Sequence, residues 1–268
     1  MSGDGMSDAN GKQHSTWLIP DWEAPANVKA LITTRQAIDE SLSSEPPYNG
    51  FNLALHVDDD VSSVERNREA LQARLELEHA PQWLEQIHGT KIVEAKSDGL
   101  MRTADASYTR QSQLPCAIMT ADCLPILLCD RAGSQVAAVH AGWRSLAKGI
   151  LRNSLDQFNC PSSQILAYLG PAIGQTHFEV GIDVLEGFYD KALSPAHCEA
   201  ISAAFRPSIH KPMKFNADLY QLARAELTQL GVESISGGGF CTYDDENRFY
   251  SYRRDGQTGR MASLIYLT

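Results

Sequence analysis

The chain has 268 residues, of which 43% are hydrophobic and 21% charged, proportions typical of a globular protein with a core of its own. Its formal net charge of −10 disfavours nucleic acid as a partner, because such binding depends on basic surfaces that neutralise phosphates. No apolar run approaches the roughly 20 residues that span a bilayer, so we also expect no membrane contact.

The first residues, MSGDGMSDANGKQHS, are polar and glycine-rich and lack the apolar stretch of a secretory signal. We therefore expect a disordered tail at residues 1–15, and a single catalytic domain at residues 16–268 that works in the cytoplasm. The six cysteines are irregularly spaced and form no Cys-x-x-Cys pair, which favours reduced thiols over a disulfide framework.

In the first half of the chain, NVKALITTR (27–35) predicts a strand and a Ser/Pro/Gly-rich loop follows it. Residues 61–77 predict a helix, because their apolar residues recur at helical spacing. These apolar residues are Val61, Val64, Leu71 and Leu75. The candidates for its N-cap are Asp60, Ser62 and Ser63. WLEQIHGTKIVEA (83–95) predicts two short strands around a glycine turn.

The second half begins with CAIMTADCLPILLCD (116–130), which predicts two strands interrupted at Asp122–Pro125. A further strand at 134–144 ends at His140–Gly142, and helical spacing follows over 145–158. ILAYLGPAIG (165–174) predicts a buried strand and 217–231 an amphipathic helix that stops at Gly231. The last segment, 247–268, alternates like two strands around the turn DGQTG. We expect a mixed sheet, or two sheets, flanked by helices.

Three potential metal ligands stand beside apparent strand ends: His88, Cys123 and His140. Two imidazoles and a thiolate can bind zinc and leave a fourth position open for water or substrate. A cysteine beside a histidine can also act as a nucleophile on an acyl carbon, with Asp122 orienting the imidazole. Both readings need a deprotonated sulfur near an imidazole, so spacing alone leaves them open.

Arginine side chains are the second candidate group, because a guanidinium suits phosphate or carboxylate. Arg144 follows His140 by four residues, and Arg66 lies on the helix predicted over 61–77. Further arginines flank the last turn: Arg253, Arg254 and Arg260.

Taken in order, the motifs resemble a bacterial family. The motifs are FNLALHV, VERNREAL, QIHGTKIVEA, ADASYT, TADCLPILL, VHAGWR, LGPAIG, FEVG and FYSYRRDGQTGR. The family is that of the laccase-domain or multicopper polyphenol oxidase proteins, now associated with purine nucleoside phosphorylase and adenosine deaminase activity and with peptidoglycan editing. The resemblance covers about residues 27–268, and TADCLP together with HAGWR makes it specific.

The resemblance implies an α/β (α+β) fold, a four-layer sandwich of two mixed β-sheets between helices, which is also found in cysteine hydrolases. It implies zinc ligands at His88, Cys123 and His140, with copper as the alternative metal. The substrates would be a purine nucleoside and phosphate, and the chain would be a monomer or a homodimer. Three positions depart from the family pattern: Asp58 and Ser145 replace glycines, and His177 replaces a small residue or cysteine.

The leading hypothesis is therefore a zinc-dependent enzyme that carries out phosphorolysis of purine nucleosides and deamination of adenosine. Zinc would lower the pKa of a bound water toward ~7 for attack on C6 of adenine. Arg144 and Arg66 are expected to hold phosphate, and Asn52 and Gln86 to contact the substrate. Cys123, Asp122 and Arg144 are the expected catalytic residues, Asp122 as a supporting or acid–base group.

Two other enzymes remain as alternatives. The first is an amidase or hydrolase with Cys123 as nucleophile, which acts on peptidoglycan precursors. The second is a copper polyphenol oxidase, which is disfavoured because several coppers need many histidines. Only three of the eight histidines lie in or beside the motifs near the proposed site: His56, His88 and His140. A non-enzymatic metal-binding protein is disfavoured because polar groups gather at strand ends.

Overall fold

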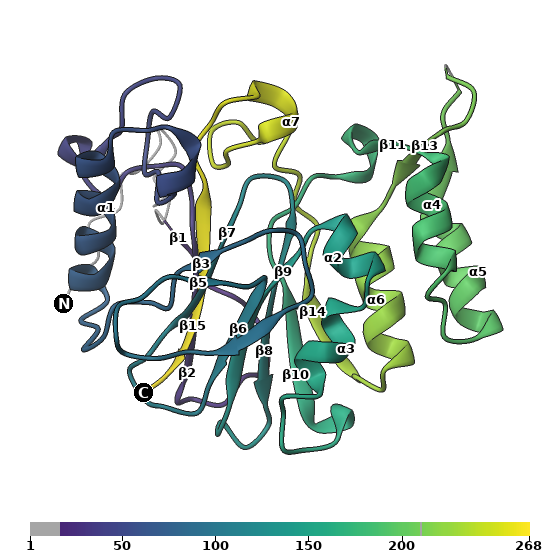
Figure 1. Ribbon diagram of the computed structural model, residues 1–268, viewed down its shortest axis with the longest axis horizontal. Coiled ribbons are helices and arrows are strands. Elements are labelled where there is room, and N and C mark those ends of the chain that lie inside the picture. Colours follow the sequence, from purple (N-terminus) through teal and green to yellow (C-terminus); the bar gives the residue numbers. More distant parts are fainter. Residues whose placement is uncertain (1–16, 210) are drawn as a thin grey trace, which may run out of the picture.

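The computed structural model describes residues 17–209 and 211–268. The tail expected at residues 1–15 lies outside the described residues. Two β-sheets form the centre of the molecule (Figure 1). The four-stranded sheet is antiparallel throughout and has the order β1 (Trp17–Leu18), β2 (Val28–Thr33), β15 (Met261–Leu267) and β7 (Cys116–Thr120).

The six-stranded sheet is mixed. Its order is β14 (Ser234–Gly237), β10 (Ile165–Leu169), β8 (Leu124–Asp130), β9 (Val136–Ala141), β6 (Ala106–Thr109) and β4 (Ile92–Glu94). The two edge strands run parallel to their neighbours, whereas the four inner strands are antiparallel to one another.

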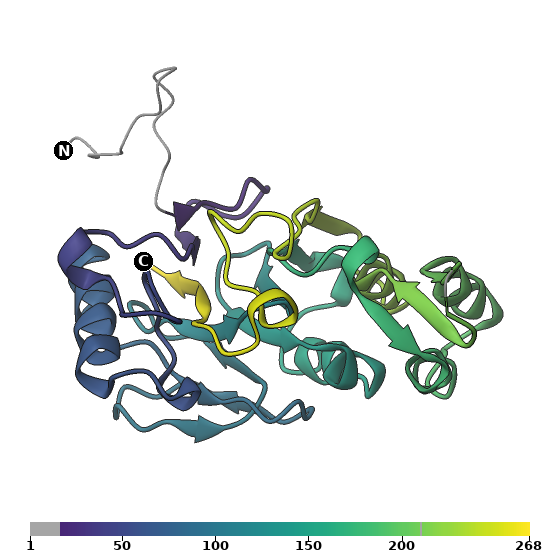
Figure 2. The same cartoon turned by 90° about the horizontal axis from the view of Figure 1, so that it is seen from above.

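Helices cover the outer faces of both sheets, as the two views show (Figures 1 and 2). Helix α1 (Val61–Arg74) packs on the four-stranded sheet. Three helices pack on the six-stranded sheet: α2 (Trp143–Ala147), α3 (Ile150–Leu155) and α6 (Leu219–Gln229). The order helix, sheet, sheet, helix confirms the four-layer sandwich that the resemblance implies, with the difference that only one of its two sheets is mixed.

Smaller elements complete the fold. Beyond α6 lie α4 (Ile182–Tyr189), α5 (Pro195–Ala203) and a three-stranded antiparallel sheet of β11 (Glu179–Gly181), β13 (Lys214–Ala217) and β12 (Phe205–Pro207). A parallel pair joins β3 (Leu84–Glu85) to β5 (Arg102–Thr103), and α7 (Tyr252–Asp255) is a single turn. The short 3-10 helices are η1 (Glu40–Leu42), η2 (Leu55–Val57), η3 (Ser162–Gln164) and η4 (Gln175–His177).

Alternation along β7 explains how one strand serves two layers. Cys116 and Ile118 point into the core between the sheets, whereas Ala117 and Met119 point toward α1. Cys129 on β8 also lies in the core between the sheets. Cys116 and Cys129 are therefore packing residues.

The two short strands predicted within 83–95 are confirmed as β3 and β4, which belong to different sheets. Two other local predictions need correction. Residues 145–158 do not form one helix, because Gly149 has a φ of +86° and separates α2 from α3. The final segment is not a hairpin: residues 252–255 form α7, which Ser251 caps by accepting a hydrogen bond from the amide of Arg254. Among the described residues, no helix has the length and apolar character needed to cross a membrane.

The helix predicted over 61–77 is confirmed as α1, and Asp60 is its N-cap because its carboxylate accepts from the amide of Ser63. Just before it, Asp58 has a φ of +65°, in the left-handed region that glycine adopts most easily. The aspartate therefore takes a backbone conformation that suits the glycine expected here from the resemblance.

Candidate metal centre and active-site pocket

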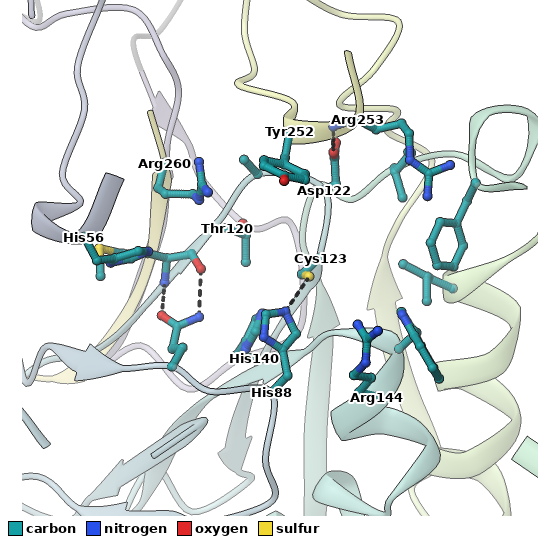
Figure 3. Close-up of a pocket in the computed structure, with 17 residues that line it drawn as sticks. His56, His88, Thr120, Asp122, Cys123, His140, Arg144, Tyr252, Arg253 and Arg260 are labelled. Atoms are coloured by element: carbon teal, nitrogen blue, oxygen red, sulfur yellow. Dashed lines mark hydrogen bonds between the residues drawn. The ribbon is translucent and has the colours of Figure 1, made fainter. Parts of the chain in front are cut away.

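One pocket brings together His88, Cys123 and His140 from three separate segments (Figure 3). His140 lies on β9, Cys123 in the connection from β7 to β8, and His88 in the loop that follows β3. Their ligand atoms all lie within 4.8 Å of one another. The distance from Cys123 Sγ to His88 Nε2 is 3.7 Å, close to the about 3.6 Å expected between sulfur and nitrogen ligands of a tetrahedral zinc ion.

A buried carboxylate, Asp105, holds two of these ligands in place. Its Oδ1 lies 2.9 Å from Nδ1 of His140 and accepts the backbone N–H of His88 at 2.8 Å. Its Oδ2 accepts the N–H of Gly89 at 2.6 Å. Burial raises the pKa of this carboxyl, but the bonds from His140 and the two amides outweigh burial and lower it. With a proton on Nδ1 directed at Asp105, Nε2 of His140 is left free to bind a metal.

Gly142 leaves space that a metal centre needs. A Cβ at this position would lie 3.0 Å from Cδ2 of His88 and 3.1 Å from Sγ of Cys123. Any side chain would push these two ligands apart. The glycine of the HAGWR motif is therefore explained by the close approach of its backbone to the triad.

Electrostatics favour a thiolate at Cys123. Burial opposes ionisation of the thiol, but the His140 and His88 imidazoles beside it prevail and lower the pKa of Cys123 to about 6. Burial likewise opposes charge on His140, and its contacts with Cys123 and Asp105 prevail and raise the pKa of this imidazole to about 9. A soft thiolate beside two imidazoles is a donor set that suits zinc.

We expect Asp105→Asn to weaken metal binding about 10- to 100-fold, the usual effect of losing a carboxylate that orients a metal-binding histidine. The amide keeps the size of the side chain but removes its charge and one acceptor. The measurement is the dissociation constant for Zn²⁺ from chelator competition. Asp98→Asn, at an exposed carboxylate paired with Arg102, is the matched control and should leave affinity unchanged. Equal affinities of both variants would contradict the role of Asp105.

The pocket around the triad has a volume of about 450 Å³, within the range of small-molecule sites. Figure 3 shows His56 and Arg260 on one side of the triad and Arg144 on the other. Arg260 donates to the backbone oxygens of Thr258 and Gly259, and Arg144 lies over the ring of Trp143 at 4.4 Å. Among the described residues, neither arginine has a carboxylate partner, so both positive charges are available to an anion.

Of the other three residues predicted to contact phosphate or substrate, only one lines the pocket. Arg66 is exposed, does not line the pocket and donates to Ser63 Oγ, which corrects the expectation that it holds phosphate there. Asn52 is fully buried behind the pocket and accepts the backbone N–H of Arg260, so it positions that arginine instead of touching a ligand. Gln86 does line the pocket, but its amide makes two 2.8 Å bonds to the backbone of Met119.

Asp122 lies in the pocket wall next to Cys123 and links it to the C-terminal segment. It has a φ of +99°, and its two carboxylate oxygens accept from Thr242 Oγ1 at 2.6 Å and from the N–H of Arg253 at 2.7 Å. Because both oxygens are occupied as acceptors, this geometry fits a positioning role better than proton transfer to a substrate. Arg254, the neighbour of Arg253, bonds three backbone carbonyls and is structural.

Comparison with known proteins places this chain in a family. The family model described as multi-copper polyphenol oxidoreductase laccase matches residues 29–268. The chain belongs to this family. Within the family, a protein named purine nucleoside phosphorylase from Pseudomonas aeruginosa is 50% identical over 253 residues, or 94% of this chain and 99% of that protein. The Escherichia coli relative YfiH, also named purine nucleoside phosphorylase, is 45% identical over 254 residues, with the same two coverages.

A solved laccase-family structure agrees with the fold. The Neisseria meningitidis protein of family DUF152 is 47% identical and superposes with a TM-score of 0.87 over 94% of this chain and 99% of its own. The laccase family implies a metal, and His88, Cys123 and His140 fit one, because three soft or borderline donors converge beside a glycine that leaves them room.

Sequence reasoning assigns no role to two contributors to this site. Asp105 stands in the motif ADASYT, where an acidic residue between two alanines is the available signal. His56 follows FNLAL and lines the pocket beside Arg260. His177, a departure from the family pattern, is not among the residues that line the pocket, and its Nε2 lies 2.7 Å from Asp244 Oδ1.

Proposed function

We propose that this chain is a zinc-dependent purine nucleoside phosphorylase that also deaminates adenosine. The names of relatives at 45–50% identity support the first activity. The observation that carries the proposal is the presence, in one pocket, of the His–Cys–His triad and of Arg260 and Arg144, which have no carboxylate partner among the described residues. A metal-binding triad beside two available cations suits a reaction between an anion and a neutral nucleoside.

In phosphorolysis, an oxygen of phosphate forms a bond to C1′ of the ribose while the bond from C1′ to N9 breaks, and the purine leaves with that electron pair. Arg260 and His56 are placed to bind phosphate on one side of the triad, and Arg144 to neutralise charge on the other. Tyr252 and Trp143 line the same pocket and offer ring faces for the purine.

Zinc held by His88, Cys123 and His140 would supply a Lewis acid that polarises an oxygen in the pocket. The protein's part is to keep these ligands deprotonated and fixed. Asp105 orients His140, and Asp122 holds Arg253 and Thr242 around Cys123. Deamination needs the same pocket to bring a water oxygen to C6 of adenine and to release ammonia.

A thermal-shift screen tests the substrate class. We expect inosine together with phosphate to raise the melting temperature, because ligands that bind only the folded state stabilise it by mass action. At one hundred times the dissociation constant the gain is about 2.7 kcal/mol. Muropeptides serve as the comparison and should give no shift. Stabilisation by muropeptides, and none by nucleoside with phosphate, would overturn the proposal.

A cysteine-nucleophile amidase that acts on peptidoglycan precursors is the second candidate. The observation that favours it is the lowered pKa of Cys123, to about 6, next to two imidazoles in an open pocket. Such a pair can attack an acyl carbon without a metal. The two candidates differ in what metal removal does, since an amidase of this kind would keep its activity after treatment with a chelator.

After metal removal, we expect iodoacetamide to alkylate Cys123 rapidly down to about pH 6. Above that pH the thiolate predominates, and below it the rate should fall about tenfold per pH unit as the thiol becomes protonated. An ordinary thiol, with a pKa near ~8.5, would already be slow at pH 7. Mass spectrometry of the labelled peptide gives the rate. Loss of all activity with chelator alone, before alkylation, would exclude the amidase.

A further inference from the structure

A second group of potential ligands lies outside the pocket, where the loop 170–178 meets the turn 241–245. It comprises His177, Cys241 and Asp244, whose ligand atoms all lie within 4.8 Å of one another. We infer that these three side chains form a second divalent metal site, selective for zinc-like ions. The three donors come from two segments more than sixty residues apart, so the fold and not local sequence brings them together.

The geometry is close to that of a bound site. His177 Nε2 lies 2.7 Å from Asp244 Oδ1, a distance at which the two atoms share a proton. A tetrahedral zinc ion would take the place of this proton and separate the atoms to about 3.3 Å. The His177 ring is already oriented, because it stacks on Tyr243 with centroids 4.1 Å apart and an interplanar angle of 10°.

The surroundings of Cys241 are those of a sulfur that accepts hydrogen bonds. Its Sγ accepts the backbone N–H of Gly174 at 3.3 Å, and the amides of Tyr243 and Asp244 also contact this side chain. A Cβ at Gly174 would lie 3.0 Å from Sγ, so glycine is required for this approach. Burial, the largest effect, raises the pKa of the free Cys241 thiol, and the converging amides offset only part of this, so metal binding here has to displace the thiol proton.

Nitrogen, sulfur and oxygen donors in one site favour zinc over magnesium or calcium, which prefer oxygen alone. Asp244 is exposed and His177 half-buried, so water can occupy the fourth position. Binding releases the proton of the Cys241 thiol to solvent, because the metal takes the thiolate. In the absence of metal the cluster is a hydrogen-bonded His–Asp pair beside a thiol.

A metal here would hold together the loop 170–178 and the turn 241–245, which support one wall of the pocket. Arg253, which lines the pocket, donates to the backbone oxygens of His177 and Glu179. Thr242, next to Cys241, donates to Asp122, which precedes Cys123. The second site would therefore brace the loops on which the pocket depends while contributing no atom to the pocket itself, a structural role.

Cobalt titration of the full chain tests the inference. After removal of metal with a chelator, Co²⁺ is added and the thiolate-to-cobalt absorption band is followed together with stoichiometry by equilibrium dialysis. We expect two equivalents for the unchanged chain. The Cys123→Ser variant should retain one equivalent with a thiolate band, because Cys241 is then the thiolate that remains in a cluster. The band should disappear when Cys241→Ser is added.

The control is Cys198→Ser, a half-buried cysteine on α5 outside both clusters, which should leave two equivalents. Adding His177→Ala to Cys123→Ser should also remove the thiolate-to-cobalt band, because it deletes another ligand of the second site. Circular dichroism confirms that this variant is folded. A Cys123→Ser protein without a thiolate band at saturating Co²⁺ would overturn the inference. So would a band that persists after Cys241→Ser.

Discussion

Replacing Cys123 with serine is expected to remove zinc from the His88–Cys123–His140 centre and to lower both phosphorolysis and deamination more than about 100-fold. Loss of a partner that only orients a metal ligand costs roughly 10- to 100-fold, and loss of the ligand itself should exceed that. The Cys123 sulfur contacts both imidazoles, and its thiolate is the one negative charge of the triad. Serine keeps the shape but is not deprotonated at neutral pH.

The measurements are zinc content per chain by elemental analysis, and the rates of inosine phosphorolysis and adenosine deamination. Cys160→Ser is the matched control, because this half-buried cysteine lies away from the pocket. It should leave zinc and both rates unchanged. If the second metal site is filled, Cys123→Ser should retain part of the zinc while losing activity. Full activity in Cys123→Ser would refute the ligand assignment.

The triad could be predicted from sequence because each ligand stands beside a residue that breaks a strand. Cys123 lies between β7 and β8, and His140 is the second-last residue of β9. Neighbouring antiparallel strands bring these two positions together: His140 pairs with Pro125, two residues beyond Cys123. His88 stands beside Gly89 in the loop after β3, where its φ of +57° lies outside any regular strand.

The contacts of the Asp105 carboxylate could not be predicted from sequence patterns. Its motif, ADASYT, mixes polar and apolar residues, and nothing in the spacing indicates that its carboxylate reaches His140, 35 residues away, and two amides of the His88 loop. That convergence depends on β6 lying beside β9. Because a carboxylate buried without partners would be costly, the burial of Asp105 in the structure accounts for these contacts.

The two strands predicted for the C-terminal segment do not both form, for a related reason. Alternation over 247–268 is typical of two strands, yet only β15 forms. Residues 252–255 turn into α7 because distant groups hold them: Asp122 accepts the N–H of Arg253, and Arg254 donates to the carbonyls of Thr242 and Tyr243. These tertiary contacts override local preference and place Tyr252 and Arg253 over the pocket.

Tertiary contacts also decide which arginine can bind phosphate in the pocket. Arg66 lies on an amphipathic helix within a family motif, but its helix position turns it to solvent. Arg260 follows a glycine turn, and its backbone N–H is held by Asn52. Partial burial lowers the pKa of its guanidinium, which the charges of Cys123 and Asp122 partly offset. Arg260 is the stronger candidate for binding phosphate, because its half-buried guanidinium has no carboxylate partner within residues 17–209 and 211–268.

Arg260→Ala is therefore expected to raise the KM for phosphate on the order of 100-fold, since a charged hydrogen bond contributes about 1.5–3 kcal/mol and a guanidinium can make two to one phosphate. Arg260→Lys should raise the KM for phosphate about tenfold, because lysine keeps the charge but cannot make two parallel hydrogen bonds to one phosphate. Deamination needs no phosphate, so its rate and the zinc content should change little. Arg66→Ala is the matched control. Equal phosphate KM values for Arg260→Ala and Arg66→Ala would show that Arg260 does not bind phosphate, because of these two arginines Arg260 alone lines the pocket.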